Sequence, residues 1–206
     1  MNRCVIIGGA NIADYQRTGS YIKNGDYIIY CDSGLKHMGG LRAEPSLIVG
    51  DFDSHENPRL RTETIVLPTK KDDTDTCFAV KEAIRRGFCD FLLLGVSGGR
   101  LDHTLGNVSI LLYLDSIGKS GLLIDDHSEM EIVSSSPREI KSDFSFFSLI
   151  NITGTARGVT VENAKYPLKD AEITCEYQYG ISNEVLPGMS SVVSVAEGKL
   201  LLIRVF

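Results

Sequence analysis

The chain has 206 residues, of which 43% are hydrophobic and 23% are charged, and its formal net charge is −6. This length can form one large domain or two small ones. The negative charge argues against a general nucleic-acid-binding surface, because such a surface needs many Lys and Arg side chains to neutralise phosphate. Small ligands and a metal ion suit the composition better.

The cysteines and histidines are scattered along the chain. The five cysteines form no C-x-x-C pair and their number is odd, which is typical of a reducing compartment. The four histidines lack metal-ligand spacing, so zinc is not expected. Met1–Arg3 leads directly into a short apolar run, and no run approaches the roughly 20 apolar residues of a membrane helix. We expect a cytoplasmic protein without a membrane partner.

The first half alternates short apolar runs with helix-like or loop segments. The runs are continuously apolar, as expected for a parallel sheet that helices cover on both faces. They predict five strands, at 4–8, 27–31, 47–50, 64–67 and 91–94. The fold class that follows for this half is α/β, with a mostly parallel, Rossmann-like sheet.

Two helices are predicted in this half. One starts near Asp75 and stops at Gly87, with Cys77 on its apolar face, and the other runs from near Asp102 to Gly118. Asp75 and Asp102 suit the positive end of the helix dipole. From position alone, both residues could equally be N-terminal caps.

The pattern changes from about Ser120. The run Leu122–Ile124 fits either a last strand of the parallel sheet or the first strand of a new unit. Alternation of apolar and polar residues follows around 172–177, and Glu197–Gly198 predicts a hairpin turn before a final strand. We therefore predict a first domain over 1–126 and an all-β antiparallel domain over 127–206.

Two aspartates follow the third predicted strand, in the segment Gly50–Ser54. Asp51 and Asp53 are two residues apart, so in extended backbone their side chains point the same way. Converging carboxylates repel each other unless a cation lies between them, and a hard divalent cation that also carries substrate phosphates is the usual solution. A solvated turn is the alternative.

Glycines and charged residues follow each of the five predicted strands. They are Gly8–Gly9, Asp32–Gly34, Asp51–Ser54, Lys71–Asp75 and Gly95–His103. The carboxyl ends of parallel strands meet at one edge, where ligands bind. Such an edge suits a nucleoside triphosphate with magnesium, since glycine N–H groups, Lys71 and Arg100 can all contact phosphate. No Walker A or complete G-x-G-x-x-G sequence is present.

Some of these residues have simpler explanations. Lys71 could be surface charge, Arg100 could pair with Asp102 or Asp75, and His103 could pack at a helix start. Cys77 is expected in the core.

Taken together, the motifs resemble the thiamine pyrophosphokinase family. The resemblance rests on four segments in this order and on two later ones: Asp32-Ser33-Gly34, Gly50-Asp51-Phe52-Asp53-Ser54, Lys71-Asp72-Asp73-Thr74-Asp75, Gly98–Asn107, Phe147–Ile150 and Ser182-Asn183-Glu184. It implies an α/β domain for ATP and metal, a β-sandwich domain that helps bind thiamine, and a homodimer with active sites at its interface. The implied reaction transfers the pyrophosphoryl group of ATP to the hydroxyl of thiamine, giving thiamine diphosphate and AMP.

The resemblance also implies roles for individual residues. Mg²⁺ would lie among Asp51, Asp53 and Asp75. Asp102 or Asp72 would orient or deprotonate the thiamine hydroxyl, next to Arg100. ATP would contact a larger set, made of Gly9, Asp32, Ser33, Gly34, Ser54, Lys71, Gly98, Gly99, Arg100, His103 and Asn107. Thiamine would contact Asp102, Ser182, Asn183 and Glu184.

The sequence departs from the family pattern in places, with Cys77 where an acidic residue is common and Asn151 where proline is common. It contains no Trp, so any stacking on thiamine must come from Tyr or Phe. Two alternative functions stay open at this point. One is a related Mg-dependent phosphoryl transferase with another alcohol acceptor, and the other is a non-catalytic nucleotide or thiamine sensor.

Overall fold

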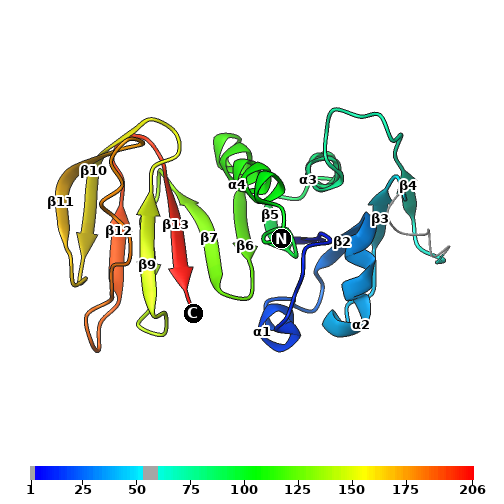
Figure 1. Cartoon of the computed structure of the whole chain (residues 1–206), viewed down its shortest axis with the longest axis horizontal. Helices are drawn as coiled ribbons and strands as arrows, with labels where there is room; N and C mark the ends of the chain where they lie inside the picture. The colour runs from blue at the N-terminus through cyan, green and yellow to red at the C-terminus, as the bar shows by residue number, and fades with distance from the viewer. Residues whose placement is uncertain (1–2, 53–59) are drawn as a thin grey trace. The chain divides into compact units, whose positions relative to one another are not determined.

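The computed structural model describes residues 3–52 and 60–206 (Figure 1). The chain divides into two compact units, Met1–Asp126 and His127–Phe206, named unit 1 and unit 2 below. Unit 1 is α/β and unit 2 is built of antiparallel strands. Within the described ranges, no helix is long and apolar enough to cross a membrane.

Unit 1 is organised around a parallel sheet with the strand order β4-β3-β2-β1-β5-β6. Its strands are β1 (Cys4–Ile7), β2 (Tyr27–Cys31), β3 (Leu47–Gly50), β4 (Thr64–Val66), β5 (Asp90–Leu94) and β6 (Ser120–Ile124). Every residue of β1 and β3 is buried, as expected for strands covered on both faces. The five strands predicted from the apolar runs are confirmed, and the run at Leu122–Ile124 belongs to the parallel sheet.

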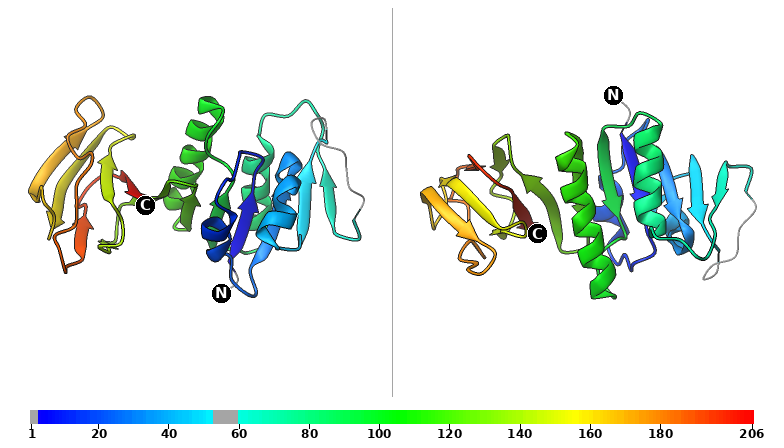
Figure 2. Two further views of the ribbon diagram at one scale, coloured as in Figure 1. Left: turned by 60° about the horizontal axis from the view of Figure 1, so that its bottom comes forward. Right: turned by 90° about the horizontal axis from the view of Figure 1, so that it is seen from above.

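The helices of unit 1 cover both faces of this sheet. They are α1 (Tyr15–Ser20), the 3-10 helix η1 (Asp32–His37), α2 (Met38–Leu41), α3 (Asp75–Arg85) and α4 (Leu101–Ser116). Helices α3 and α4 lie on one face, and α1 and α2 lie on the other (Figures 1 and 2). Their apolar residues face the strands: Ala79, Val80 and Ala83 of α3 and Val108, Leu111 and Leu114 of α4 are buried.

Helices α3 and α4 do not have Asp75 and Asp102 as their N-terminal caps. Thr74 is the N-cap of α3, and its hydroxyl accepts a hydrogen bond from the Cys77 N–H at 3.2 Å. Arg100 occupies the N-cap position of α4. Asp75 and Asp102 therefore lie in the first turns and are not caps, which leaves both carboxylates available for other contacts.

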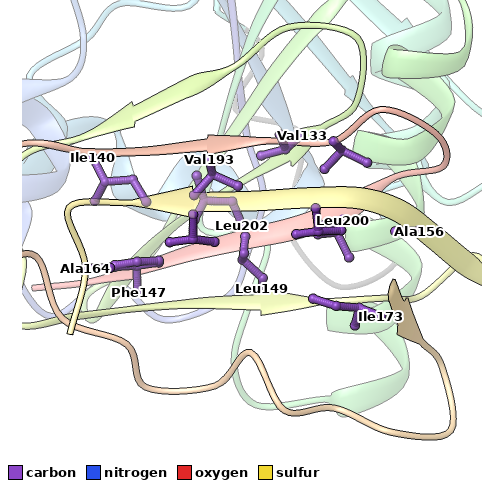
Figure 3. Packing of buried hydrophobic residues seen from close by; sticks show 13 residues of the cluster. Val133, Ile140, Phe147, Leu149, Ala156, Ala164, Ile173, Val193, Leu200 and Leu202 are labelled. Carbon is purple, nitrogen blue, oxygen red and sulfur yellow. The ribbon is translucent and has the colours of Figure 1, made fainter. Parts of the chain in front are cut away.

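Unit 2 consists of two antiparallel sheets that share one core. The first contains β7 (Ser128–Val133), β13 (Leu200–Val205) and β9 (Phe146–Ile150), in that order. The second has the order β11-β10-β12-β8, with β8 (Arg138–Ile140), β10 (Thr155–Glu162), β11 (Leu168–Thr174) and β12 (Ser191–Ser194). Side chains of both sheets, among them Phe147, Leu202, Val193 and Ile173, form the buried cluster seen in Figure 3.

Two expectations for unit 2 are corrected. The turn at Glu197–Gly198 does not close a hairpin, because β12 pairs with β10 and β8 whereas β13 pairs with β7 and β9. It joins the two sheets instead. The alternation through Tyr177 ends early, since β11 stops at Thr174 and the side chains of Cys175 and Tyr177 are exposed.

Candidate active site

The loops that follow β1 to β5 lie at one edge of the unit 1 sheet, because all these strands are parallel. A cavity of about 420 Å³ opens there, lined by Gly8–Asn11, Ser33, Thr76, Gly95–Arg100, His103 and Asn107. The loop after β1 passes very close to η1. A Cβ atom on Gly34 of η1 would lie 2.3 Å from the backbone carbonyl oxygen of Ile7, so this close approach requires glycine.

Lys71 lies between two aspartates at the same edge. Its ammonium nitrogen is 2.7 Å from Oδ2 of Asp51 and 2.5 Å from Oδ1 of Asp75. The side chains are only 17%, 10% and 19% exposed, respectively, so water screens these charges weakly. Lys71 is therefore part of the acidic site and not a surface charge.

The electrostatics of this group place Asp32 near it as well. Burial raises the pKa of the Asp75 carboxyl, Lys71 opposes that shift, and the charges of Asp51 and Asp32 add to it. For Lys71, burial alone would lower the pKa, but the hydrogen bonds to Asp51 and Asp75 outweigh burial and raise it. Asp32 itself is buried and has a left-handed backbone, with φ of 41°.

The donor set at this edge suits a hard cation. Asp53 and Ser54, both assigned to the site from the sequence, lie outside the described residues. Among the residues that are described, no three His, Cys, Asp or Glu side chains form a group that could hold a metal ion. The carboxylates of Asp51 and Asp75 nevertheless converge on one positive charge, the Lys71 ammonium. Magnesium typically uses one or two carboxylates together with substrate phosphates and water. The chemistry present thus fits Mg²⁺.

Arg100 and Asp102 form an exposed pair at the start of α4. The guanidinium donates to both carboxylate oxygens of Asp102, at 2.6 and 3.1 Å. This hydrogen bonding lowers the pKa of Asp102 to about 2. Of the two partners expected for Arg100, Asp102 and Asp75, the structure thus shows Asp102. The carboxylate of Asp102 is a weak proton acceptor in this arrangement.

A second cavity of about 580 Å³ lies beside the first and also includes His103 and Asn107 in its wall. Residues of α3, of α4 and of the loop before α3 line it, among them Asp72, Asp102 and Tyr113. Cys77 lines this cavity and is half-buried, with its sulfur 3.5 Å from Oδ1 of Asp73. The expectation that Cys77 belongs to the core is therefore wrong.

Comparison with known proteins identifies the family. The model "Thiamin pyrophosphokinase, catalytic domain" matches residues 18–120, and the model "Thiamin pyrophosphokinase, vitamin B1 binding domain" matches residues 133–200. A thiamine pyrophosphokinase of Bacillus subtilis (strain 168) is 31% identical over 163 residues, which cover 75% of this chain and 76% of the relative. The chain belongs to the thiamine pyrophosphokinase family.

Solved structures agree with this family. The crystal structure of thiamine pyrophosphokinase from B. subtilis has a TM-score of 0.86 at 25% identity and covers 100% of this chain and 99% of its own. That of the thiamin pyrophosphokinase from Geobacillus thermodenitrificans has a TM-score of 0.85 at 25% identity and covers 99% and 97%. The yeast thiamin pyrophosphokinase, with a TM-score of 0.78 at 14% identity over 100% and 86%, shares the fold.

Within the glycine-rich loop that resembles the family motif, side chains of α4 fix the backbone. The buried Asn107 amide donates to the Val96 carbonyl at 2.6 Å. The Thr104 hydroxyl accepts from the Gly98 N–H at 3.0 Å and donates to the Arg100 carbonyl at 3.1 Å. Asn107 thus lines both cavities and also holds the loop that carries Gly98 and Gly99.

Sequence reasoning missed a second support, below the loop that follows β1. His37 is buried, and its Nε2 donates to the Ala10 carbonyl at 2.7 Å while its Nδ1 is 2.8 Å from the Tyr15 hydroxyl. The neighbouring Lys36 ammonium donates to the Gly9 carbonyl. No local pattern relates His37 to Ala10, which lies 27 residues earlier in the chain.

Of the thiamine-binding residues implied by the family resemblance, Asp102 lies in unit 1, and Ser182, Asn183 and Glu184 lie in unit 2. The Asn183 amide is buried, where it accepts from the Tyr166 N–H at 3.0 Å and donates to the Tyr166 carbonyl at 2.8 Å. Glu184 pairs with Lys165 at 2.5 Å, and the Ser182 N–H donates to the Ser148 hydroxyl at 3.0 Å. The side chain of Asn183 therefore fixes the backbone on which Ser182 and Glu184 are exposed or half-buried.

Proposed function

We infer that this chain catalyses the transfer of a pyrophosphoryl group from ATP to the hydroxyl of thiamine, giving thiamine diphosphate and AMP. Membership of the thiamine pyrophosphokinase family carries this reaction. The structural observation that supports it best is the Asp51–Lys71–Asp75 cluster, which lies at the same sheet edge as the glycine-lined cavity.

We propose that Asp51 and Asp75 hold a magnesium ion together with Asp53. Two poorly exposed carboxylates directed at one cation support this assignment. When bound, the ion would neutralise charge on the phosphates of ATP.

We propose that the phosphates of ATP contact Lys71, Arg100 and the loops that line the smaller cavity. Those loops contain Gly9, Ser33, Gly98, Gly99, His103 and Asn107. Helix α4 starts at the end of the glycine-rich loop, where its N–H groups favour an anion. Asp32, Gly34 and Ser54 complete the ATP-binding set assigned from the sequence.

The chemical step needs little covalent help from the protein. The thiamine hydroxyl oxygen forms a bond to the β-phosphorus, the bond from that phosphorus to the oxygen bridging the α- and β-phosphates breaks, and AMP leaves with that oxygen. The hydroxyl proton passes to a carboxylate or to water. Because Arg100 lowers the pKa of Asp102 to about 2, Asp102 is a weak proton acceptor and serves to orient Arg100. We therefore assign the hydroxyl proton to Asp72, the other aspartate expected to act on the hydroxyl.

We further propose that Ser182, Asn183 and Glu184 of unit 2 bind thiamine, with the acidic group suited to a cationic substrate. In this proposal unit 1 is the Rossmann-like ATP and magnesium domain and unit 2 is the β-sandwich thiamine domain. The protein would act as a cytoplasmic homodimer with active sites at its interface, as the resemblance implies.

The test is to incubate the pure protein with ATP, MgCl₂ and thiamine and then separate the nucleotides and thiamine esters. AMP that forms in step with thiamine diphosphate is the expected result. ADP formation would instead indicate transfer of a single phosphoryl group. Absence of any thiamine-dependent product from folded protein would contradict the proposed function and favour a sensor.

A further inference from the structure

Lys71 occupies an unusual position for a residue that is to contact phosphate. Its ammonium does not face open solvent, since both Asp51 and Asp75 contact it and its side chain is only 17% exposed. Both of these ion pairs are with carboxylates that the proposed function assigns to magnesium. An ammonium and a divalent cation therefore compete for the same oxygen atoms.

We propose that Lys71 is the internal cation of this site, and that a divalent cation binds Asp51 and Asp75 only by displacing the Lys71 ammonium. This inference rests on the proposed function, because that function supplies the divalent cation. It assigns Lys71 a role before the nucleotide arrives, in addition to the phosphate contact proposed above.

The physical reason is electrostatic. Partly buried carboxylates repel one another strongly, because the effective dielectric constant around them is far below that of water. The Lys71 charge offsets this repulsion when no metal is bound, and the same contact lowers the affinity for a free metal ion. A cation that arrives with ATP brings phosphate oxygens along, which offer the displaced ammonium a new partner.

Lys81 provides a matched comparison in the same region. Its ammonium pairs with Asp73 at 2.7 Å, but both side chains are more exposed, at 49% and 34%. Asp73 is not among the proposed metal ligands. Removing Lys81 changes the net charge as much as removing Lys71 does, yet it leaves the Lys71 ammonium in contact with Asp51 and Asp75.

The experiment measures Mn²⁺ binding to the nucleotide-free protein, by the loss of the electron paramagnetic resonance signal of free Mn²⁺ at constant ionic strength. We expect K71M to bind Mn²⁺ at least about tenfold more tightly than the wild type, because a competing charge is gone. K81M should bind as the wild type does, K71R should retain the weak affinity, and adding D51N to K71M should abolish the gain. Circular dichroism checks folding, and K71Q replaces K71M if the latter does not fold.

Equal or weaker Mn²⁺ binding by K71M would overturn the proposal, as would an equal gain in K81M. The assay for AMP and thiamine diphosphate separates this result from the proposed function. If the wild type forms both products but K71M shows unchanged Mn²⁺ affinity, only the internal-cation role is overturned. If K71M gains Mn²⁺ affinity but the wild type forms no products, only the proposed function is overturned.

Discussion

Asp51 and Asp73 are both aspartates paired with a lysine, but their surroundings differ. The Asp51 side chain is 10% exposed and shares Lys71 with Asp75. Asp73 is 34% exposed and pairs with Lys81. The two aspartates therefore differ in exposure and in whether their lysine is shared with a second carboxylate.

We predict that D51N lowers the rate of AMP formation by about 10²–10³-fold, because it removes a carboxylate proposed to hold the Mg²⁺ that neutralises charge on the phosphates. D73N, the same substitution in the same region, should lower the rate by less than about tenfold. The measurement is steady-state AMP formation, with thermal unfolding as the folding check. Equal losses in the two variants would remove Asp51 from the site.

The sequence predicted that the segments after the strands gather at one edge, because continuously apolar runs indicate a parallel sheet. Asp32, Asp51, Lys71 and Gly98 each follow a strand of the parallel sheet, and parallel pairing brings those ends to one edge. It did not predict that Lys71 bridges Asp51, since 20 residues separate them. The support from His37 was missed for the same reason, because contacts across loops depend on exact backbone geometry.

At the level of elements, the end of α3 is tied to the sheet by a group of charges. Glu82 accepts hydrogen bonds from Arg85 and Arg86 at 2.7–2.8 Å. Arg86 also donates to the Tyr27 hydroxyl of β2 at 2.8 Å and pairs with Glu63, just before β4, at 2.5 Å. Glu82 is poorly exposed, so its ionisation state matters for stability.

We predict that this group makes unfolding pH-dependent. The hydrogen bond from Arg85 lowers the pKa of Glu82 from 4.5 to about 2, against the effect of burial and with support from Arg86. A lowered pKa in the folded state gives stability that is fully present above about pH 4.5 and is lost as the pH falls toward 2. After allowance for solvent screening, the loss should be about 1–2 kcal/mol.

Urea unfolding of the wild type and of E82Q between pH 6 and pH 2.5 measures this effect. The wild type should be more stable at pH 6, and the difference in unfolding free energy should shrink as the pH falls. A difference that stays constant with pH would show that the Glu82 charge contributes no stability.

In unit 2, the sequence predicted the presence of strands better than it predicted which strands pair with each other. Apolar alternation marks a strand without saying which strand pairs with it, and a short turn favours a hairpin on local grounds alone. The strands on either side of Glu197–Gly198, β12 and β13, belong to different sheets. This arrangement lets each sheet contribute a buried face to the shared core. Tertiary packing thus decided what the turn sequence left open.

The pairing of β7 with β13 contains a poorly exposed charge cluster. Arg204 is 7% exposed and donates to Glu129, which is 8% exposed, at 2.9 Å and to Glu131 at 2.6 Å. Its guanidinium also lies 5.6 Å from the centre of the Phe144 ring. Removing one member leaves buried charge with weaker compensation, which costs more than the intact pair contributes.

We therefore predict that R204M destabilises the protein by about 3–5 kcal/mol. The double variant R204M/E129M should be less destabilised than R204M, because it removes the Glu129 carboxylate together with its partner. Urea unfolding followed by far-ultraviolet circular dichroism measures both. Equal stability of the single and double variants would mean that the Glu129 charge is compensated without Arg204.

For the whole molecule, each unit has a hydrophobic core, and most of the residues proposed for ATP and for thiamine fall in different units. The unit 1 core surrounds a parallel sheet, and the unit 2 core lies between two antiparallel sheets. The ATP residues follow the strands of unit 1, whereas Ser182–Glu184 belong to unit 2. If each unit binds its own substrate, each ligand should slow local opening mainly where it binds, because a ligand stabilises the state to which it binds.

Hydrogen exchange followed by mass spectrometry tests this division of roles. With a saturating Mg²⁺ and a non-hydrolysable ATP analogue, we expect slower exchange in peptides that contain Gly8–Asn11 and Gly95–Arg100. With thiamine alone, we expect slower exchange in peptides around Ser182–Glu184, and S182A should reduce that effect without changing protection by the nucleotide. Thiamine protection confined to unit 1 would contradict the proposed role of Ser182–Glu184, because bound substrate must reduce the opening of the segment that contacts it.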